Sequence, residues 1–73
     1  MNLPNRAMIE NLRKRYPADT RVELIRMDDV QAPPVGTQGK VLFVDDIGSI
    51  HVAWDSGSSL AICYGVDQCR IVG

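Results

Sequence analysis

Two aromatic residues and a pair of acidic residues have the types that suit recognition of a protein partner: Trp54, Tyr64, Asp28 and Asp29. Aromatic rings beside carboxylates can hold a proline or a basic side chain of another protein. Each residue also has a purely structural interpretation. Trp54 is the only tryptophan and ends an alternating apolar series, as a core residue would. Aspartates in a loop commonly hold turns. The sequence leaves both interpretations open.

Basic residues gather in residues 1–17, where four of them stand against one acidic residue, Glu10. They are Arg6, Arg13, Lys14 and Arg15. The remainder of the chain is acidic, and the net charge is −1. A short basic helix can contact phosphates, in binding that weakens steeply with salt, whereas an acidic body repels a polyanion. Nucleic-acid binding through these four residues is therefore the alternative prediction.

Catalysis and metal binding find little support in the remaining polar residues. His51, Cys63 and Cys69 lack the close cysteine pair and the fourth ligand of a zinc site, and a lone histidine on a strand has no evident base or orienting partner. Strand alternation places Cys63 outward and Cys69 inward, which favours two free thiols. The segment DDIG at 45–48 is typical of a turn, because calcium loops need several oxygen ligands at alternating positions. We predict no enzyme, no metal and no cofactor.

Length and composition limit the fold that must position these residues. A chain of 73 residues supports one small core, and 45% apolar with 23% charged residues is the mixture of an ordinary globular domain. No apolar run approaches the roughly 20 residues of a membrane-spanning helix, and the first residues lack the apolar stretch of a signal peptide. These features predict a cytoplasmic protein.

A short helix is expected within an N-terminal arm that covers residues 1–17. Its apolar positions recur near helical spacing: Leu3, Met8, Ile9 and Leu12. Asn5 can cap its first turn, and Tyr16 followed by Pro17 ends it. A helix of about three turns is marginal alone in water. Its apolar stripe should therefore pack on the rest of the chain or pair two copies into a homodimer.

After Pro17 the chain consists of short β-type runs separated by turn residues. The predicted strands cover residues 20–27, 39–44, 49–54, 58–63 and 68–72. The two central links are short enough for hairpins, and Gly57 can supply the positive φ that such a link often requires. The second, third and fourth strands should therefore form a meander.

Alternation along the strands predicts which side chains point inward. The inward set comprises Val22, Leu24, Ile50, Val52, Trp54, Leu60 and Ile62. His51 and Ala53 should point outward. In the second strand, Val41 and Val44 cannot both point inward without a bulge, and Val41 with Phe43 is the simpler choice. The register of that strand stays open.

A long first loop, a three-strand meander, a one-turn link at 64–67 and a short closing strand are the parts of a Src-homology-3-like barrel. The chain resembles an uncharacterised family of small domains encoded in bacteria, their phages and integrated mobile elements. The resemblance rests on the segments ENLRKRYPADTRVEL, MDDVQAPPVGTQGKV, VDDIGSIHVAWDSGSSLA and YGVDQCRIV. It implies a fold but no activity, and its pattern has glycine at the position of Asp19, which leaves that turn open.

A second, more distant resemblance covers about half of the chain. The segment GTQGKV followed by IHVAWDSGSSLAICYG is similar to the Mind-bomb-type repeat. In that repeat, Trp-Asp-x-Gly and Tyr-x-x-Gly belong to a peptide-binding barrel. The likeness implies peptide binding by analogy of fold, and a shared fold does not by itself carry function.

The sequence thus predicts a mainly β protein, with a small five-stranded Src-homology-3-like barrel at residues 18–73 preceded by a short N-terminal α-helix. We expect a non-enzymatic adaptor, an accessory protein of a phage or mobile element in the bacterial cytoplasm. Its expected partner is an unidentified protein or peptide with basic or proline residues. The expected binding residues are Trp54, Tyr64, Asp28 and Asp29.

Overall fold

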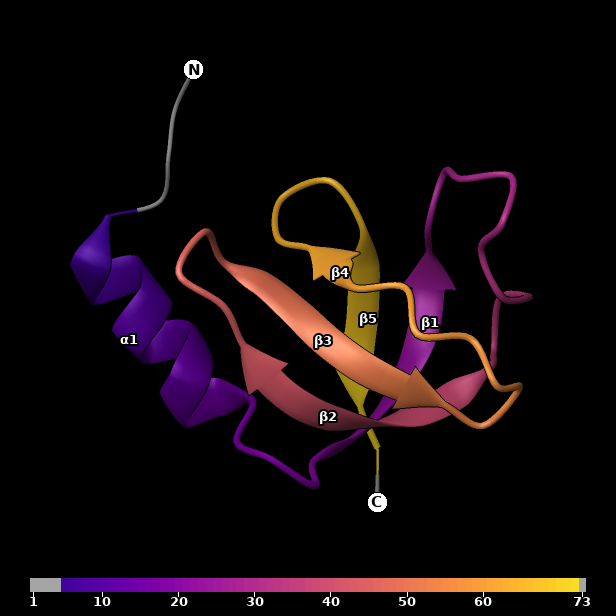
Figure 1. The fold of residues 1–73 in the computed structure, drawn as a ribbon, viewed down its shortest axis with the longest axis horizontal. Coiled ribbons are helices and arrows are strands. Elements are labelled where there is room, and N and C mark those ends of the chain that lie inside the picture. The colour runs from indigo at the N-terminus through magenta and orange to yellow at the C-terminus, as the bar shows by residue number, and fades with distance from the viewer. Residues whose placement is uncertain (1–4, 73) are drawn as a thin grey trace.

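The computed structural model describes residues 5–72 and contains one helix followed by a five-stranded antiparallel sheet (Figure 1). Helix α1 covers Arg6–Arg15, and strands β1 to β5 cover Arg21–Arg26, Gln38–Val44, Ser49–Trp54, Ile62–Cys63 and Gln68–Ile71. The strand order β4-β3-β2-β1-β5 confirms the predicted meander and the mainly β class. The sheet is not closed. Of the predicted barrel, only the five strands and the short helix that precedes them are confirmed.

Helix α1 begins and ends where the sequence predicts. The Asn5 side chain accepts a hydrogen bond from the Met8 backbone N–H at 2.8 Å, and the Tyr16 N–H donates to the Leu12 carbonyl at 2.8 Å. Leu3, which the sequence places on the apolar stripe, lies outside the described residues. Within residues 5–72 no helix is long and apolar enough to cross a membrane.

The apolar face of α1 packs against β2 of the same chain, one of the two outcomes expected for its apolar stripe. Ile9 and Leu12 are the buried residues of the helix. Arg13 fastens the end of the helix to the neighbouring hairpin, because its guanidinium donates to the Val44 carbonyl at 3.2 Å and to Asp46 at 2.8 Å. The helix lies beside the β2–β3 turn (Figure 1).

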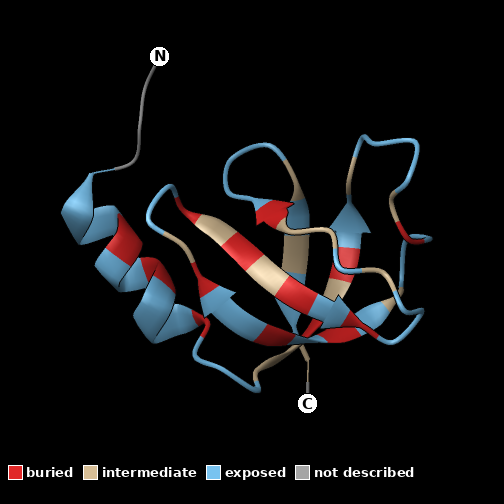
Figure 2. Cartoon of the chain, in the orientation of Figure 1, coloured by how far each residue is buried: buried red, intermediate tan, exposed pale blue. Residues whose placement is uncertain are grey.

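The core lies between the inner face of the sheet and the end of the helix (Figure 2). Its buried side chains are Leu12, Tyr16, Val22, Leu24, Val41, Val44, Ile50, Val52, Trp54 and Ile62. The predicted inward positions of β1 and β3 are all in this set. Leu60 is not, because it is only partly buried and precedes β4. The sequence predicted only that Tyr16 ends the helix, but its side chain is also buried in the core, on the side nearest the helix.

Strand β2 contains a bulge, whereas the simpler interpretation of the sequence assumed a regular strand. Val41 pairs with Val52, but Phe43 pairs with His51, so the register shifts between Val41 and Phe43. An extra residue on one strand turns the side chains that follow it to the other face. Val44 consequently points into the core beside Val41, and Phe43 is 54% exposed. The choice of Val41 with Phe43 as inward residues is wrong for this reason.

The fourth strand is much shorter than the predicted range 58–63. Only Ile62–Cys63 forms a strand. The preceding segment is irregular, and two of its carbonyl groups accept hydrogen bonds from Trp54. Ser58 accepts from the Trp54 backbone N–H at 3.1 Å, and Leu60 accepts from its indole N–H at 2.8 Å.

Gly57 and Asp19 are among the residues that adopt the left-handed backbone conformation at turns. Gly57 has φ +94° in the β3–β4 link, as predicted. Asp19 has φ 75°, which side chains other than glycine rarely adopt. Its N–H donates to the Val41 carbonyl at 2.8 Å and so joins the turn before β1 to β2. The glycine that the family pattern has here would fit this conformation.

Candidate functional site

Trp54 lies in the core. Its side chain is 3% exposed, and its indole N–H is satisfied by the Leu60 carbonyl at 2.8 Å. Gly39 lies opposite Trp54 on β2, where an added Cβ would lie 2.9 Å from the Trp54 Cα. Trp54 therefore has no exposed ring face for a partner. Of the two interpretations of Trp54, the structure supports the core residue and not the binding residue.

The register of β3 and β4 also separates Trp54 from Tyr64. Cys63, the last residue of β4, pairs with Ser49 at the start of β3. Trp54 lies five residues farther along β3, roughly 17 Å at about 3.4 Å per residue. Tyr64 directly follows Cys63 and so lies near the opposite end of β3. The two aromatic residues do not form one platform.

The acidic pair lies in the loop between β1 and β2. Both aspartates are exposed. The Asp29 carboxylate accepts a hydrogen bond from the Gln31 N–H at 2.7 Å, which is the geometry of an aspartate that holds its own turn. Neither Asp28 nor Asp29 lines the groove that contains Tyr64. The structure therefore does not bring the four predicted binding residues together.

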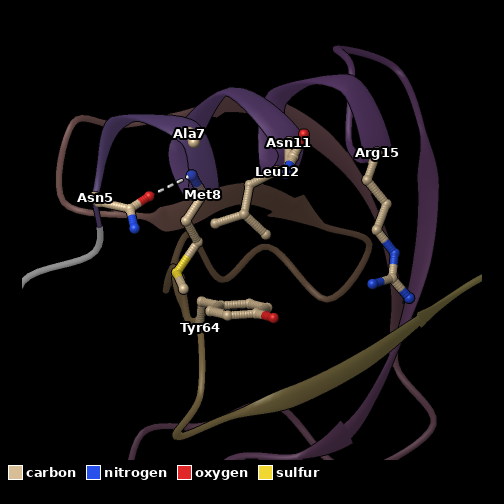
Figure 3. Close-up of a pocket in the computed structure, with 7 residues that line it drawn as sticks. All are labelled: Asn5, Ala7, Met8, Asn11, Leu12, Arg15 and Tyr64. Atoms are coloured by element: carbon tan, nitrogen blue, oxygen red, sulfur yellow. Dashed lines mark hydrogen bonds between the residues drawn. The ribbon is translucent and has the colours of Figure 1, made fainter.

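Tyr64 lines a groove of about 410 Å³ at the side of α1 (Figure 3). The lining residues are Asn5, Ala7, Met8, Asn11, Leu12, Arg15 and Tyr64. Figure 3 shows Met8 and Leu12 extending from the helix toward the Tyr64 ring. Met8 is 39% exposed and Tyr64 is 48% exposed, whereas Leu12 is buried. A cavity of this size lies within the range of ligand pockets, about 300–1,000 Å³, so the groove has room for apolar side chains of a partner.

A tight turn holds Tyr64 in this position. The backbone N–H groups of Val66 and Asp67 both donate to the Cys63 carbonyl, at 3.0 and 2.9 Å. The Asp67 carboxylate accepts from the Cys63 N–H at 2.9 Å. Gly65 has φ +86° and allows the chain to reverse directly after Tyr64. These bonds fix the backbone on both sides of the tyrosine.

Among the described residues that line the groove, Arg15 alone is charged. Its guanidinium carbon lies 5.6 Å from the centre of the Tyr16 ring. Within the described part of the chain, Arg15 has no carboxylate at ion-pair distance. The groove thus has an apolar middle and a positive charge at one end.

The four basic residues of the arm do not share one free surface. Arg13 is bound to Asp46 at 2.8 Å, and Arg6 lies 3.6 Å from Glu10. Arg13 and Arg15 are two residues apart, and a helix turns about 100° per residue, so they flank the buried stripe on opposite sides. The predicted nucleic-acid interface would therefore have to use residues that are already paired or that face apart.

His51 has an orienting partner that the sequence did not reveal. Its Nε2 atom lies 2.8 Å from the Asp45 carboxylate, and its ring stacks on Phe43 with ring centres 4.3 Å apart. Asp45 also accepts hydrogen bonds from the backbone of Ser49 and Ile47. Partial burial raises the pKa of Asp45, but the bonds from His51 and the backbone outweigh it, so this pKa lies below its ordinary value. An aspartate that opens a hairpin turn six residues before a histidine is the signal that could have identified this pair.

The two cysteines are free and occupy the predicted faces. Cys63 is exposed, whereas Cys69 is partly buried against the core. Burial raises the pKa of the Cys69 thiol, and hydrogen bonding by Tyr16 and the charge of Arg15 oppose this only in part. His51 is paired with Asp45 by contrast. Cys63, Cys69 and His51 therefore do not come together as one group of side chains.

Comparison with known proteins supports the predicted family. A family profile described as a domain of unknown function, DUF4314, matches residues 5–72. No curated protein and no solved structure matches the chain. The profile covers α1 and all five strands, including the groove around Tyr64. The chain therefore belongs to the DUF4314 family of domains of unknown function.

Proposed function

We propose that the protein is a non-enzymatic binding module that takes a segment of another protein into the groove between α1 and Tyr64. The observation that carries this proposal is the partly exposed Tyr64 ring, held on a tight turn opposite the partly exposed Met8. Aromatic residues in a pocket are typical anchors of protein interfaces, and methionine adapts its shape to different partners. Of the four residues predicted as binding residues, only Tyr64 lines this groove.

The sequence resemblances support the wider setting that we propose for this module. They favour an accessory protein of a phage or mobile element that acts in the bacterial cytoplasm, and an architecture related to Src-homology-3-like barrels. The likeness to the Mind-bomb-type repeat agrees with peptide binding. Each of these points is part of the proposal and rests on sequence resemblance alone.

The two alternatives have less support. Nucleic-acid binding through the arm would need Arg6 and Arg13, which are engaged with Glu10 and Asp46. A homodimer through the helix would need its apolar stripe, but Ile9 and Leu12 are already buried within the chain. We therefore retain protein binding as the leading function.

A selection experiment tests the proposed function. An mRNA-displayed library of random decapeptides is selected on the immobilised protein, and enriched peptides are then tested against Tyr64→Ala and Val35→Ala. Val35 is 71% exposed and does not line the groove, so it is a matched control for the loss of an exposed apolar side chain. We expect peptides that bind the parent and Val35→Ala alike and bind Tyr64→Ala at least about tenfold more weakly.

Circular dichroism melts of both variants establish that they remain folded. Failure to enrich any peptide whose binding depends on Tyr64 would contradict the proposed function.

A further inference from the structure

We propose that the segment bound in the groove is acidic and presents an apolar side chain to the middle of the groove and a carboxylate to the end at Arg15. This inference rests on the proposed function, because it concerns the occupant of the same groove. It replaces the basic or proline-bearing partner that the sequence suggested through Asp28 and Asp29, neither of which lines the groove.

The described polar side chains along the groove are those of Asn5, Asn11, Arg15 and Tyr64, and Arg15 alone among them is charged. Asn5 uses its side-chain oxygen to accept from the Met8 N–H at 2.8 Å, the dashed bond in Figure 3. Its amide NH₂ remains available to donate to a partner. Arg15 carries only donors, whereas Asn11 and the Tyr64 hydroxyl can both donate and accept. A segment that satisfies both ends must bring acceptors, and a carboxylate is the strongest acceptor that a peptide offers to a guanidinium.

The charge of the groove is positive although the whole chain has a net charge of −1. Within residues 5–72, no aspartate or glutamate lines the groove. Asp67, close to Tyr64 in the turn, directs its carboxylate to the Cys63 N–H. The charge of Arg15 reaches the nearby core, where it lowers the pKa of both Tyr16 and Cys69 against the larger raising effect of burial.

The spacing of the donors defines the length of the segment. Asn5 and Arg15 lie ten residues apart, about 15 Å along a helix. An extended peptide of about five residues spans that distance. Such a segment can place its apolar side chain against Met8 and Tyr64 in the middle and its carboxylate at Arg15.

Two measurements test the acidic character of the segment. The first is the composition of the decapeptides whose binding depends on Tyr64, in which we expect aspartate and glutamate to exceed lysine and arginine. The second is fluorescence anisotropy with the most enriched peptide, labelled with fluorescein, against Arg15→Glu and Lys14→Glu. The two variants have the same change of charge on neighbouring residues of one helix, but only Arg15 lines the groove.

We expect Arg15→Glu to weaken binding about tenfold and Lys14→Glu to weaken it less than about twofold, because only a contact charge passes from attraction to repulsion. A library selected on Arg15→Glu should enrich lysine and arginine instead. Tyr64-dependent peptides that are neutral or basic, or that lose equal affinity for both variants, would overturn the acidic segment and leave the proposed function standing.

Sedimentation velocity tests whether a second copy of this protein, and not a segment of another protein, occupies the groove. A parent protein that sediments as a dimer, and becomes a monomer in Tyr64→Ala, would overturn both the acidic segment and the proposed function. A monomeric parent, with Tyr64-dependent acidic peptides, supports both.

Discussion

Replacement of Trp54 by alanine is expected to destabilise the fold severely, whereas replacement of Tyr64 by alanine should not. Trp54 is 3% exposed and belongs to the central cluster of buried side chains. Removal of a large buried aromatic side chain costs about 3–5 kcal/mol. Tyr64 is 48% exposed, and its replacement should cost less than about 1 kcal/mol. The contrast separates a core residue from a surface residue.

The size of the effect is large compared with the stability of so small a domain. At about 0.05–0.15 kcal/mol per residue, the 73 residues provide roughly 4–11 kcal/mol in total. Trp54→Ala thus removes between about a quarter and all of the stability. Trp54→Phe keeps an aromatic ring but removes the indole N–H, and it leaves the Leu60 carbonyl without its partner at a cost of about 1 kcal/mol or more. We therefore expect the free energy of unfolding to decrease in the order parent, Trp54→Phe, Trp54→Ala.

Urea denaturation followed by far-ultraviolet circular dichroism measures these differences without relying on tryptophan fluorescence. Trp54→Phe keeps the prediction testable if the alanine variant fails to fold. An alanine variant that unfolds at the urea concentration of the parent would refute the core assignment. If that variant also lost Tyr64-dependent peptides, Trp54 would have to be returned to the binding surface.

Three further predictions concern residues outside the groove. Asp19→Gly should raise the unfolding free energy by about 0.5–1 kcal/mol, because glycine tolerates φ 75°, and a lower urea midpoint would contradict this. Cys63→Ser should change stability by less than about 0.5 kcal/mol and Cys69→Ser should lower it by about 1 kcal/mol, since only Cys69 packs on the core; equal urea midpoints would contradict their assigned faces. The folded pKa of Asp45 is below its unfolded value of about 3.9, so its contribution is present above that pH and is lost as the pH falls through the folded value. Urea midpoints measured from pH 5 to 2 should therefore fall more for the parent than for Asp45→Asn, and parallel curves would contradict the role of this carboxylate.

The sequence predicted local features of the fold because they depend on neighbouring residues. The cap at Asn5, the end of the helix at Tyr16 and the turn at Gly57 each depend on a few adjacent side chains. Alternation likewise predicted the inward positions of β1 and β3. The bulge in β2 was not predictable in this way, since Phe43 and Val44 are both apolar and either suits an inward position. Stacking of Phe43 on His51 on the outer face accompanies the observed register.

The candidate site depends on the register between strands, which a single sequence does not reveal. Trp54 and Tyr64 are ten residues apart in sequence, and pairing of Cys63 with Ser49 carries them to different ends of β3. The groove forms only because the side of α1 faces Tyr64. The hydrogen bond from Arg13 to Asp46 contributes to this position of the helix. Composition identified Arg15 as part of a basic arm, whereas only the packing of the helix distinguishes it from Arg13.

The central claim is that a protein segment binds between α1 and Tyr64, away from Trp54. A nitrogen-15 NMR titration with a Tyr64-dependent decapeptide tests it most directly, because the protein has one indole N–H, that of Trp54. We predict that the backbone signals of Met8, Leu12, Arg15 and Tyr64 shift on binding while the indole signal of Trp54 stays in place. Shifts confined to the Trp54 indole and the loop around Asp28 and Asp29, with the signals of α1 unchanged, would contradict the claim.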